Sequence, residues 1–293
     1  MIVGDVLSAS EIARLPEGMH HSGPPTRWAA MTRPSQALHS FLEAPVHDGS
    51  DLLICDVAGG RVLRLSGDDW SVEHQYDGAP HAMRLIGGRA IVADYWHGLI
   101  EMTGQDTWRL LHAGPDGARF LGLSDMALAP DGAIWLTDSG RSSQADPVGS
   151  LYRVPPDLSA PQRAATGIAY PNGVALSPDG AWVYVAETRA NAVQRLSSTL
   201  PDNGLPMRGV HLHLSGGLGP DGLAIGPQGH LAVAQAQAGR AFVFDHLGDP
   251  IATIRLPQGT WTTSVAFDPD GRLLIVEAER GAIWAADPPE PMQ

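Results

Sequence analysis

The stretch Tyr170-Pro-Asn-Gly-Val-Ala-Leu-Ser-Pro-Asp-Gly180, followed by Ala181-Trp-Val-Tyr-Val-Ala-Glu187, decides the fold of this chain. It reads as a polar residue after a proline, a short apolar strand, a Pro-Asp-Gly turn and a second apolar strand. This pattern is typical of a β-hairpin, and it places Asn172 at the mouth of the hairpin.

The same unit recurs along the chain, and its copies open 38, 43, 48, 49 and 42 residues apart. Intervals of roughly 40 to 50 residues are typical of four-stranded propeller blades. Six copies therefore predict an all-β fold, a six-bladed β-propeller with four-stranded antiparallel blades. The copies open at Glu43 (EAPVHDGSDLLICD), His81 (HAMRLIGGRAIVAD), Ser124 (SDMALAPDGAIWLTD), Asn172 (NGVALSPDGAWVYVAE), Asp221 (DGLAIGPQGHLAVAQ) and Thr263 (TSVAFDPDGRLLIVE).

The repeats fill most of the 293 residues and leave no linker between them, which predicts a single domain. We expect an N-terminal segment over 1–40, the propeller over 41–287 and a short tail over 288–293. A hydrophobic content of 43% is ample for a core, and 34 glycines and 24 prolines suit a chain with many tight turns.

The last repeat holds only three strands, so its outer strand must come from the N-terminal segment. The sequence predicts that residues 26–32 form this strand and complete blade six. Ahead of it, Ser8-Ala-Ser-Glu11 fits a capping box, which predicts a short surface helix that ends at Pro16.

Charge and cysteine content exclude several classes of partner. A net charge of −13 repels nucleic acid and anionic lipid. The single cysteine, Cys55, allows no internal disulfide. No apolar stretch approaches the ~20 residues of a membrane span. We expect a cytoplasmic protein with a small-molecule substrate and neither a nucleic-acid nor a membrane partner; the sequence leaves the oligomeric state open.

The residues that open the six repeats should converge on the axis of the ring. Polar residues at these positions are not a packing requirement, and a divalent cation would satisfy buried oxygen donors. Glu43, Asn172 and Asp221 are the candidate ligands. Their oxygens suit calcium first, with magnesium or manganese as alternatives. The rival interpretation is turn chemistry, since Asn and Asp after proline also bond their own backbone.

Four motifs resemble the family of gluconolactonases, luciferin-regenerating enzymes and senescence marker proteins, which are six-bladed propellers. They are FLEAPV, PNGVALSPDG, SGGLGPDGLAIGPQGHLAVA and TTSVAFDPDG, and the resemblance runs from about Phe41 to Asp287. It implies that Glu43, Asn172 and Asp221 hold one catalytic divalent metal, most often calcium or zinc. It also implies lactone hydrolysis, because many members open aldonolactones.

Two repeat openings depart from the family. Ser124 stands where asparagine usually precedes aspartate, which weakens a metal site by one amide oxygen. His81 stands where PNG often opens the second repeat. His81 could ligate the metal and favour zinc, act as a general acid, or simply hydrogen-bond a neighbour.

Loops on the same face as these openings supply candidates for substrate binding. The insertion from Ser139 to Val148 is either a lid or a surface loop. A repeated acid or amide at the end of each second strand predicts a structural role, the bonding of loop amides. The substrate-binding candidates are Tyr95, Trp96, His97, Arg119 and Arg141, and the structural positions are Asp56, Asp94, Asp138, Glu187, Gln235 and Glu277.

The first functional hypothesis is a metal-dependent lactonase acting on a sugar lactone, in which the cation polarises the ester carbonyl. Asp221, or next Asp125, would deprotonate the attacking water. The alternatives are another hydrolysis or a lyase reaction with His81 as base, and a non-catalytic propeller in which the metal only ties the blades together.

Overall fold

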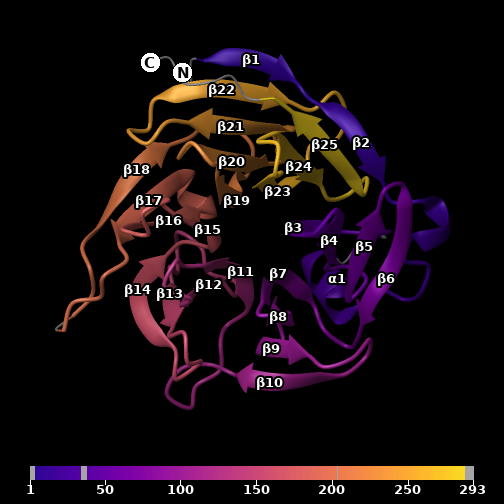
Figure 1. The fold of residues 1–293 in the computed structure, drawn as a ribbon. Coiled ribbons are helices and arrows are strands. Elements are labelled where there is room, and N and C mark those ends of the chain that lie inside the picture. The colour runs from indigo at the N-terminus through magenta and orange to yellow at the C-terminus, as the bar shows by residue number, and fades with distance from the viewer. Residues whose placement is uncertain (1–3, 34–37, 203, 288–293) are drawn as a thin grey trace.

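Six β-sheets stand around a common axis in the computed structural model, which describes residues 4–33, 38–202 and 204–287 (Figure 1). This confirms the predicted six-bladed propeller. Each blade has four antiparallel strands that follow one another from the axis outward. The innermost strands are β3 (Leu42–Asp48), β7 (Pro80–Ile86), β11 (Leu123–Leu128), β15 (Pro171–Leu176), β19 (Gly219–Ile225) and β23 (Thr262–Phe267).

The remaining strands follow the predicted order of each repeat. The second strands are β4 (Asp51–Asp56), β8 (Arg89–Asp94), β12 (Ile134–Asp138), β16 (Trp182–Glu187), β20 (Leu231–Ala236) and β24 (Leu273–Glu277). The third are β5 (Arg61–Ser66), β9 (Gly98–Met102), β13 (Gly149–Val154), β17 (Ala192–Ser197), β21 (Arg240–Phe244) and β25 (Ala282–Ala286). The outer strands within the repeats are β6 (Asp69–Gln75), β10 (Trp108–His112), β14 (Gln162–Ile168), β18 (Arg208–His213) and β22 (Pro250–Arg255).

An N-terminal strand closes blade six, as predicted, but it is not the predicted segment. Strand β2 (Ser10–Arg14) pairs antiparallel with β25. Strand β1 (Asp5–Ser8) pairs in parallel with β22 and adds a fifth strand to blade five. The expected helix at Ser8–Glu11 was therefore wrong. Two open sheet edges offer this segment more hydrogen bonds than a capped helical turn would.

The segment expected to be the closing strand is instead helix α1 (Arg27–Thr32). Its start follows local rules, because the Thr26 hydroxyl accepts a hydrogen bond from the Ala29 amide at 3.3 Å and acts as the N-cap. Trp28 and Ala29 are buried. Short 3-10 turns occur at η1 (Glu17–Met19) and η2 (Thr188–Ala190).

The core lies between neighbouring blades, where apolar side chains of successive sheets interdigitate. One cluster joins blades six and one through Leu42, Ile54 and Val276, all with essentially no exposed surface. Burying each such side chain contributes about 1.5–3 kcal/mol. The ring closes with direct bonds as well, since Thr263 donates to the Leu42 carbonyl at 2.7 Å and the Ala44 amide donates to Ser264 at 2.9 Å.

The acids at the ends of the second strands have the predicted structural role. Five of them accept a hydrogen bond of 2.7–3.1 Å from the backbone amide just ahead of the innermost strand. Gln235 differs, because its side-chain amide donates to the Gly216 carbonyl and to Asn191. The five are Asp56, Asp94, Asp138, Glu187 and Glu277.

No helix in the described part of the chain is long and apolar enough to cross a membrane. The predicted tail at 288–293 lies outside the described residues. The division into an N-terminal segment and a propeller remains a prediction.

Candidate functional site

A cavity of about 340 Å³ lies at the hub of the ring. Five of the six predicted repeat-opening residues line it, although they come from five different blades. Aromatic and polar side chains from α1 and from the loops around the hub complete the wall. The five are Glu43, His81, Ser124, Asn172 and Asp221.

β-bulges aim these side chains inward. In every blade the pairing of the innermost strand with the second strand slips at the opening residue. A bulge interrupts the alternation of a strand and re-aims a side chain. Glu43 immediately precedes a bulge, and the other five opening residues lie within one.

Two glycines let the innermost strands approach one another at the hub. A Cβ on Gly173 would lie 2.3 Å from the Asp221 carbonyl oxygen and 2.6 Å from the Leu223 nitrogen. A Cβ on Gly222 would lie 2.8 Å from the Cα of Ser264. The glycines that follow Asn172 and Asp221 are thus required by contact between neighbouring blades.

Two carboxylates share the cavity with an amide. Burial raises the pKa of Glu43, and the neighbouring Asp221 and Asp125 raise it further. Burial and Asp125 also raise the pKa of Asp221, and a hydrogen bond from the Asn172 side chain opposes that shift. Like charges held close together out of water destabilise each other unless a positive charge compensates them.

The donor set fits a hard divalent cation. Within residues 4–33, 38–202 and 204–287, neither Glu43 nor Asp221 forms an ion pair with an arginine, so their charge is uncompensated. Two carboxylates and an amide oxygen are ligands that calcium and magnesium prefer. No group of three His, Cys, Asp or Glu side chains among the described residues is placed to hold a metal ion.

Ser124 keeps its oxygen available despite a tight contact. Its hydroxyl lies 2.5 Å from that of Ser139, and the Ser139 hydroxyl donates to the Pro171 carbonyl. Since a carbonyl only accepts, the hydrogen of Ser139 is used there, and Ser124 must donate to Ser139. The lone pairs of the Ser124 oxygen therefore remain free for a ligand in the cavity.

His81 is neutral at physiological pH. Its Nδ1 lies 3.1 Å from the Ala79 carbonyl oxygen, so Nδ1 carries the proton and donates. Burial lowers the pKa of His81 to about 4. The ring contacts Trp28 and Tyr95, with centroids 5.5 Å away from each. His81 thus presents an unprotonated Nε2 rather than an imidazolium.

Asp125 and Thr263 do not line the hub cavity. The carboxylate of Asp125 accepts hydrogen bonds from the Val174 amide at 2.9 Å and from the Met126 amide at 2.7 Å, which ties blade three to blade four. Burial raises the pKa of Asp125 to about 6. Thr263 is fully buried and bonds the first blade.

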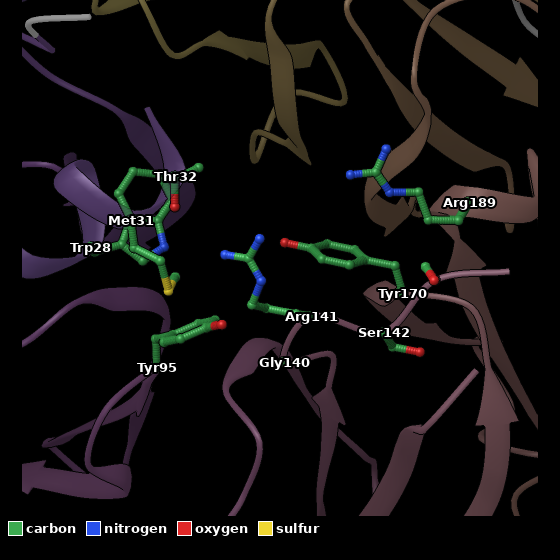
Figure 2. A pocket seen from close by; sticks show the side chains of 10 residues that line it. Trp28, Met31, Thr32, Tyr95, Gly140, Arg141, Ser142, Tyr170 and Arg189 are labelled. Carbon is green, nitrogen blue, oxygen red and sulfur yellow. The ribbon is translucent and has the colours of Figure 1, made fainter. Parts of the chain in front are cut away.

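A second cavity of about 420 Å³ adjoins the hub cavity and shares four wall residues with it. Of the predicted substrate-binding residues, Tyr95 and Arg141 line it (Figure 2). The other three lie outside both cavities. Trp96 packs on Tyr95, Arg119 donates to the Trp96 carbonyl at 3.0 Å, and His97 lies 2.6 Å from the Asp77 carbonyl oxygen.

The loop from Ser139 to Val148 forms part of the wall through Gly140, Arg141, Ser142 and Ser143. Ser142 anchors it, because its hydroxyl donates to the Ile168 carbonyl at 2.8 Å and accepts from the Gly149 amide at 3.0 Å. The tip of the loop is exposed. The loop is therefore a tethered wall of the cavity.

Sequence reasoning missed the four residues that both cavities share, which are Trp28, Thr32, Tyr170 and Arg189. The Pro-Pro-Thr sequence ahead of α1 is an N-cap signal that could have revealed the helix carrying the first two. Tyr170 has a left-handed backbone with φ 65°, and Gln237, which also lines the hub cavity, shares this conformation with φ 56°. Such strained backbone in bulky residues concentrates at functional sites.

These features define a class, a six-bladed propeller with an oxygen-lined hub cavity beneath a polar and aromatic rim. Residues 41–279 match the SMP-30/Gluconolactonase/LRE-like region, and the chain therefore belongs to that family.

Individual relatives agree with this assignment. The lactonase drp35 of Staphylococcus haemolyticus (strain JCSC1435) is 28% identical over 234 residues, which are 74% of this chain and 70% of the relative. The lactonase drp35 of Staphylococcus aureus (strain MW2) is 32% identical over 163 residues. That alignment covers 53% of this chain, and the chain spans only 49% of the relative.

Solved structures show the same fold. A gluconolactonase from Xanthomonas campestris superimposes with a TM-score of 0.73 at 25% identity, covering 96% of this chain and 98% of that one. Regucalcin from Agrobacterium tumefaciens, described as a calcium-binding protein, superimposes with a TM-score of 0.74 at 22% identity over 98% of this chain and 96% of its own. At that identity the second likeness speaks for the fold alone.

Proposed function

We propose that this protein hydrolyses the ester of a lactone, most simply a sugar lactone, at the hub cavity. The observation that carries the proposal is the convergence of Glu43, Asn172 and Asp221, from three separate blades, on one cavity. Relatives described as lactonases and a gluconolactonase fold neighbour support it.

A divalent cation, calcium in the first instance, would be held by Glu43, Asn172 and Asp221, with the free oxygen of Ser124 as a further donor. When bound, it supplies Lewis-acid polarisation of the ester carbonyl and neutralises the two carboxylates. Zinc, magnesium and manganese are the alternatives.

Asp221 is the favoured base for the attacking water. It lines the cavity, and its raised pKa makes it a stronger proton acceptor than an ordinary carboxylate. Asp125 is the less favoured base, because both of its oxygens accept backbone hydrogen bonds and it lies outside the cavity wall.

His81 would act as a hydrogen-bond acceptor toward substrate or water. Its unprotonated Nε2 can orient a hydroxyl group, whereas the neutral ring cannot serve as an imidazolium acid near pH 7. The aromatic rings of Trp28 and Tyr95 pack against the imidazole and restrict its orientation.

The test is a panel of sugar lactones assayed with chelated protein and again after calcium, zinc, magnesium or manganese is restored. We expect turnover only with metal, and its loss in Glu43→Gln and Asp221→Asn. Gln258→Ala, a change at an exposed residue in the loop between β22 and β23, is the control. Hydrolysis that survives exhaustive chelation would contradict metal dependence, and a metal-induced rise in Tm with no turnover would indicate a binding propeller.

A further inference from the structure

Two arginines project into the second cavity, which adjoins the hub cavity and is called the upper cavity from here on. Arg141 comes from the loop between β12 and β13 in blade three, and Arg189 comes from η2 in blade four. In Figure 2 both guanidinium groups point toward the middle of the cavity from different sides. Both side chains are exposed, so a ligand entering from solvent meets them directly.

Neither guanidinium is neutralised. Among the residues that the structure describes, no Asp or Glu forms a hydrogen bond or ion pair with Arg141 or Arg189. The Arg189 guanidinium carbon lies 5.6 Å from the centre of the Tyr170 ring, an aromatic contact that leaves its positive charge without an acidic partner.

Other arginines around the mouth already have partners. Arg27 lies 3.9 Å over the ring of Trp96, and Arg119 bonds the Trp96 carbonyl. Arg33 pairs with Glu279 at 2.9 Å and covers Trp261. Among these arginines of the described residues, Arg141 and Arg189 have neither an acidic partner nor a hydrogen-bonded carbonyl, and both face the upper cavity.

The pair also runs against the charge of the whole molecule. The chain has a net charge of −13, so two positive side chains add nothing to the net charge that keeps it soluble. Two guanidinium groups that face one cavity also repel each other. Guanidinium groups bind carboxylate and phosphate through paired hydrogen bonds. The hydroxyl of Tyr170 and the side chains of Thr32 and Ser143 add further hydrogen-bonding groups to the same wall.

We propose that the lactone opened at the hub carries an anionic substituent, a carboxylate or a phosphate, which Arg141 and Arg189 bind in the upper cavity. This assignment of substrate class rests on the proposed lactone hydrolysis. Because Trp28, Thr32, Tyr170 and Arg189 line both cavities, one small molecule can place its ester carbonyl at the hub and its anionic end between the arginines.

The test compares lactones that differ only in charge. The γ-lactone of glucaric acid bears a carboxylate where the γ-lactone of gluconic acid bears a hydroxymethyl group. A second arm compares gluconic acid δ-lactone with the same lactone phosphorylated on its terminal hydroxyl. With the metal-loaded protein, kcat/KM for one of the two anionic lactones should exceed kcat/KM for its neutral counterpart. The expected ratio is about tenfold or more for each arginine that binds the anion, the size expected for hydrogen bonds to charged groups.

Variants and salt separate binding of the anion from general damage. Arg141→Gln and Arg189→Gln should each lower the anionic-to-neutral ratio of kcat/KM by about tenfold. Added salt should lower the ratio in the wild type as well. Arg255→Gln, an exposed arginine on outer strand β22, should keep the wild-type ratio. Calorimetry should show glucarate binding more tightly than gluconate, a readout that needs no turnover.

The outcomes distinguish the two proposals. A preference for the carboxylate or for the phosphate supports the assignment and identifies the anion. Equal kcat/KM for charged and neutral lactones, unaltered in Arg141→Gln and Arg189→Gln, would overturn the substrate class and leave lactone hydrolysis intact. No hydrolysis of any lactone with metal present would overturn the proposed function, and the substrate class with it.

Discussion

The replacement Gly173→Ala should damage stability and activity together, because this glycine sets the spacing of two blades at the hub. The added Cβ would lie 2.3 Å from the Asp221 carbonyl oxygen, 2.6 Å from the Leu223 nitrogen and 2.8 Å from the Gly222 carbonyl carbon. All three are backbone atoms, so no rotamer change can relieve the clash. Strands β15 and β19 would have to separate, and they carry Asn172 and Asp221.

The expected cost follows from this geometry. Overpacking of this kind destabilises a protein by about 1–3 kcal/mol. At roughly 2 °C per kcal/mol for a chain of this size, Tm should fall by about 2–6 °C. A displacement of about 1 Å in the site should reduce kcat/KM by about 100-fold. Calorimetric melting and lactone hydrolysis by the same preparation measure both effects.

Gly209→Ala is the matched control. Gly209 lies on outer strand β18 of the same blade, and a Cβ there would meet no atom within 4 Å. Its effect on stability should stay within about 0.5 kcal/mol. If Gly173→Ala has the same Tm as Gly209→Ala and retains wild-type kcat/KM, the close contact between β15 and β19 does not position the site.

Three further predictions concern the hub and its rim. Asp221→Asn should abolish turnover yet raise the Tm of the chelated protein, because it removes a buried carboxylate that raises the pKa of the neighbouring Glu43; a lower Tm than wild type in chelator would contradict this. The pKa of His81 is lowered from 6.5 to about 4, so its contribution to stability is present above 6.5 and is lost as the pH falls toward 4. Urea unfolding should show the stability difference between wild type and His81→Asn shrinking by about 3 kcal/mol from pH 7 to pH 4, and a pH-independent difference would refute it. Thr26→Ala removes the N-cap of α1 at a cost of about 1 kcal/mol, and it should raise KM more than it lowers kcat because α1 supplies Trp28 and Thr32 to the cavity wall; an unchanged KM would count against that role of α1.

The repeat pattern predicted the blades well because every copy contains its own strands and turn. The repeat-opening residues lie in the innermost strands, as the pattern predicted. The gathering of Glu43, Asn172 and Asp221 at the hub also followed from the pattern, since equivalent positions of a closed ring face its axis. Their chemical roles remain predictions.

The N-terminal segment was mispredicted because its local signals are weak and its partners are distant in sequence. Ser10–Arg14 becomes a strand only because β25, more than 260 residues later, leaves an open edge beside it. Arg27–Thr32 has the residues of a short capped helix, and the need for a closing strand outweighed that local signal in the prediction.

The amino-acid sequence by itself determined the number of blades, the order of strands within each and the polar residues at the hub, because these depend on a repeated local pattern. Tertiary structure alone decided which N-terminal strands complete blades five and six, which side chains form the rim and which arginines stay unpaired. Those features depend on contacts between segments far apart in the chain, and no local periodicity encodes such contacts.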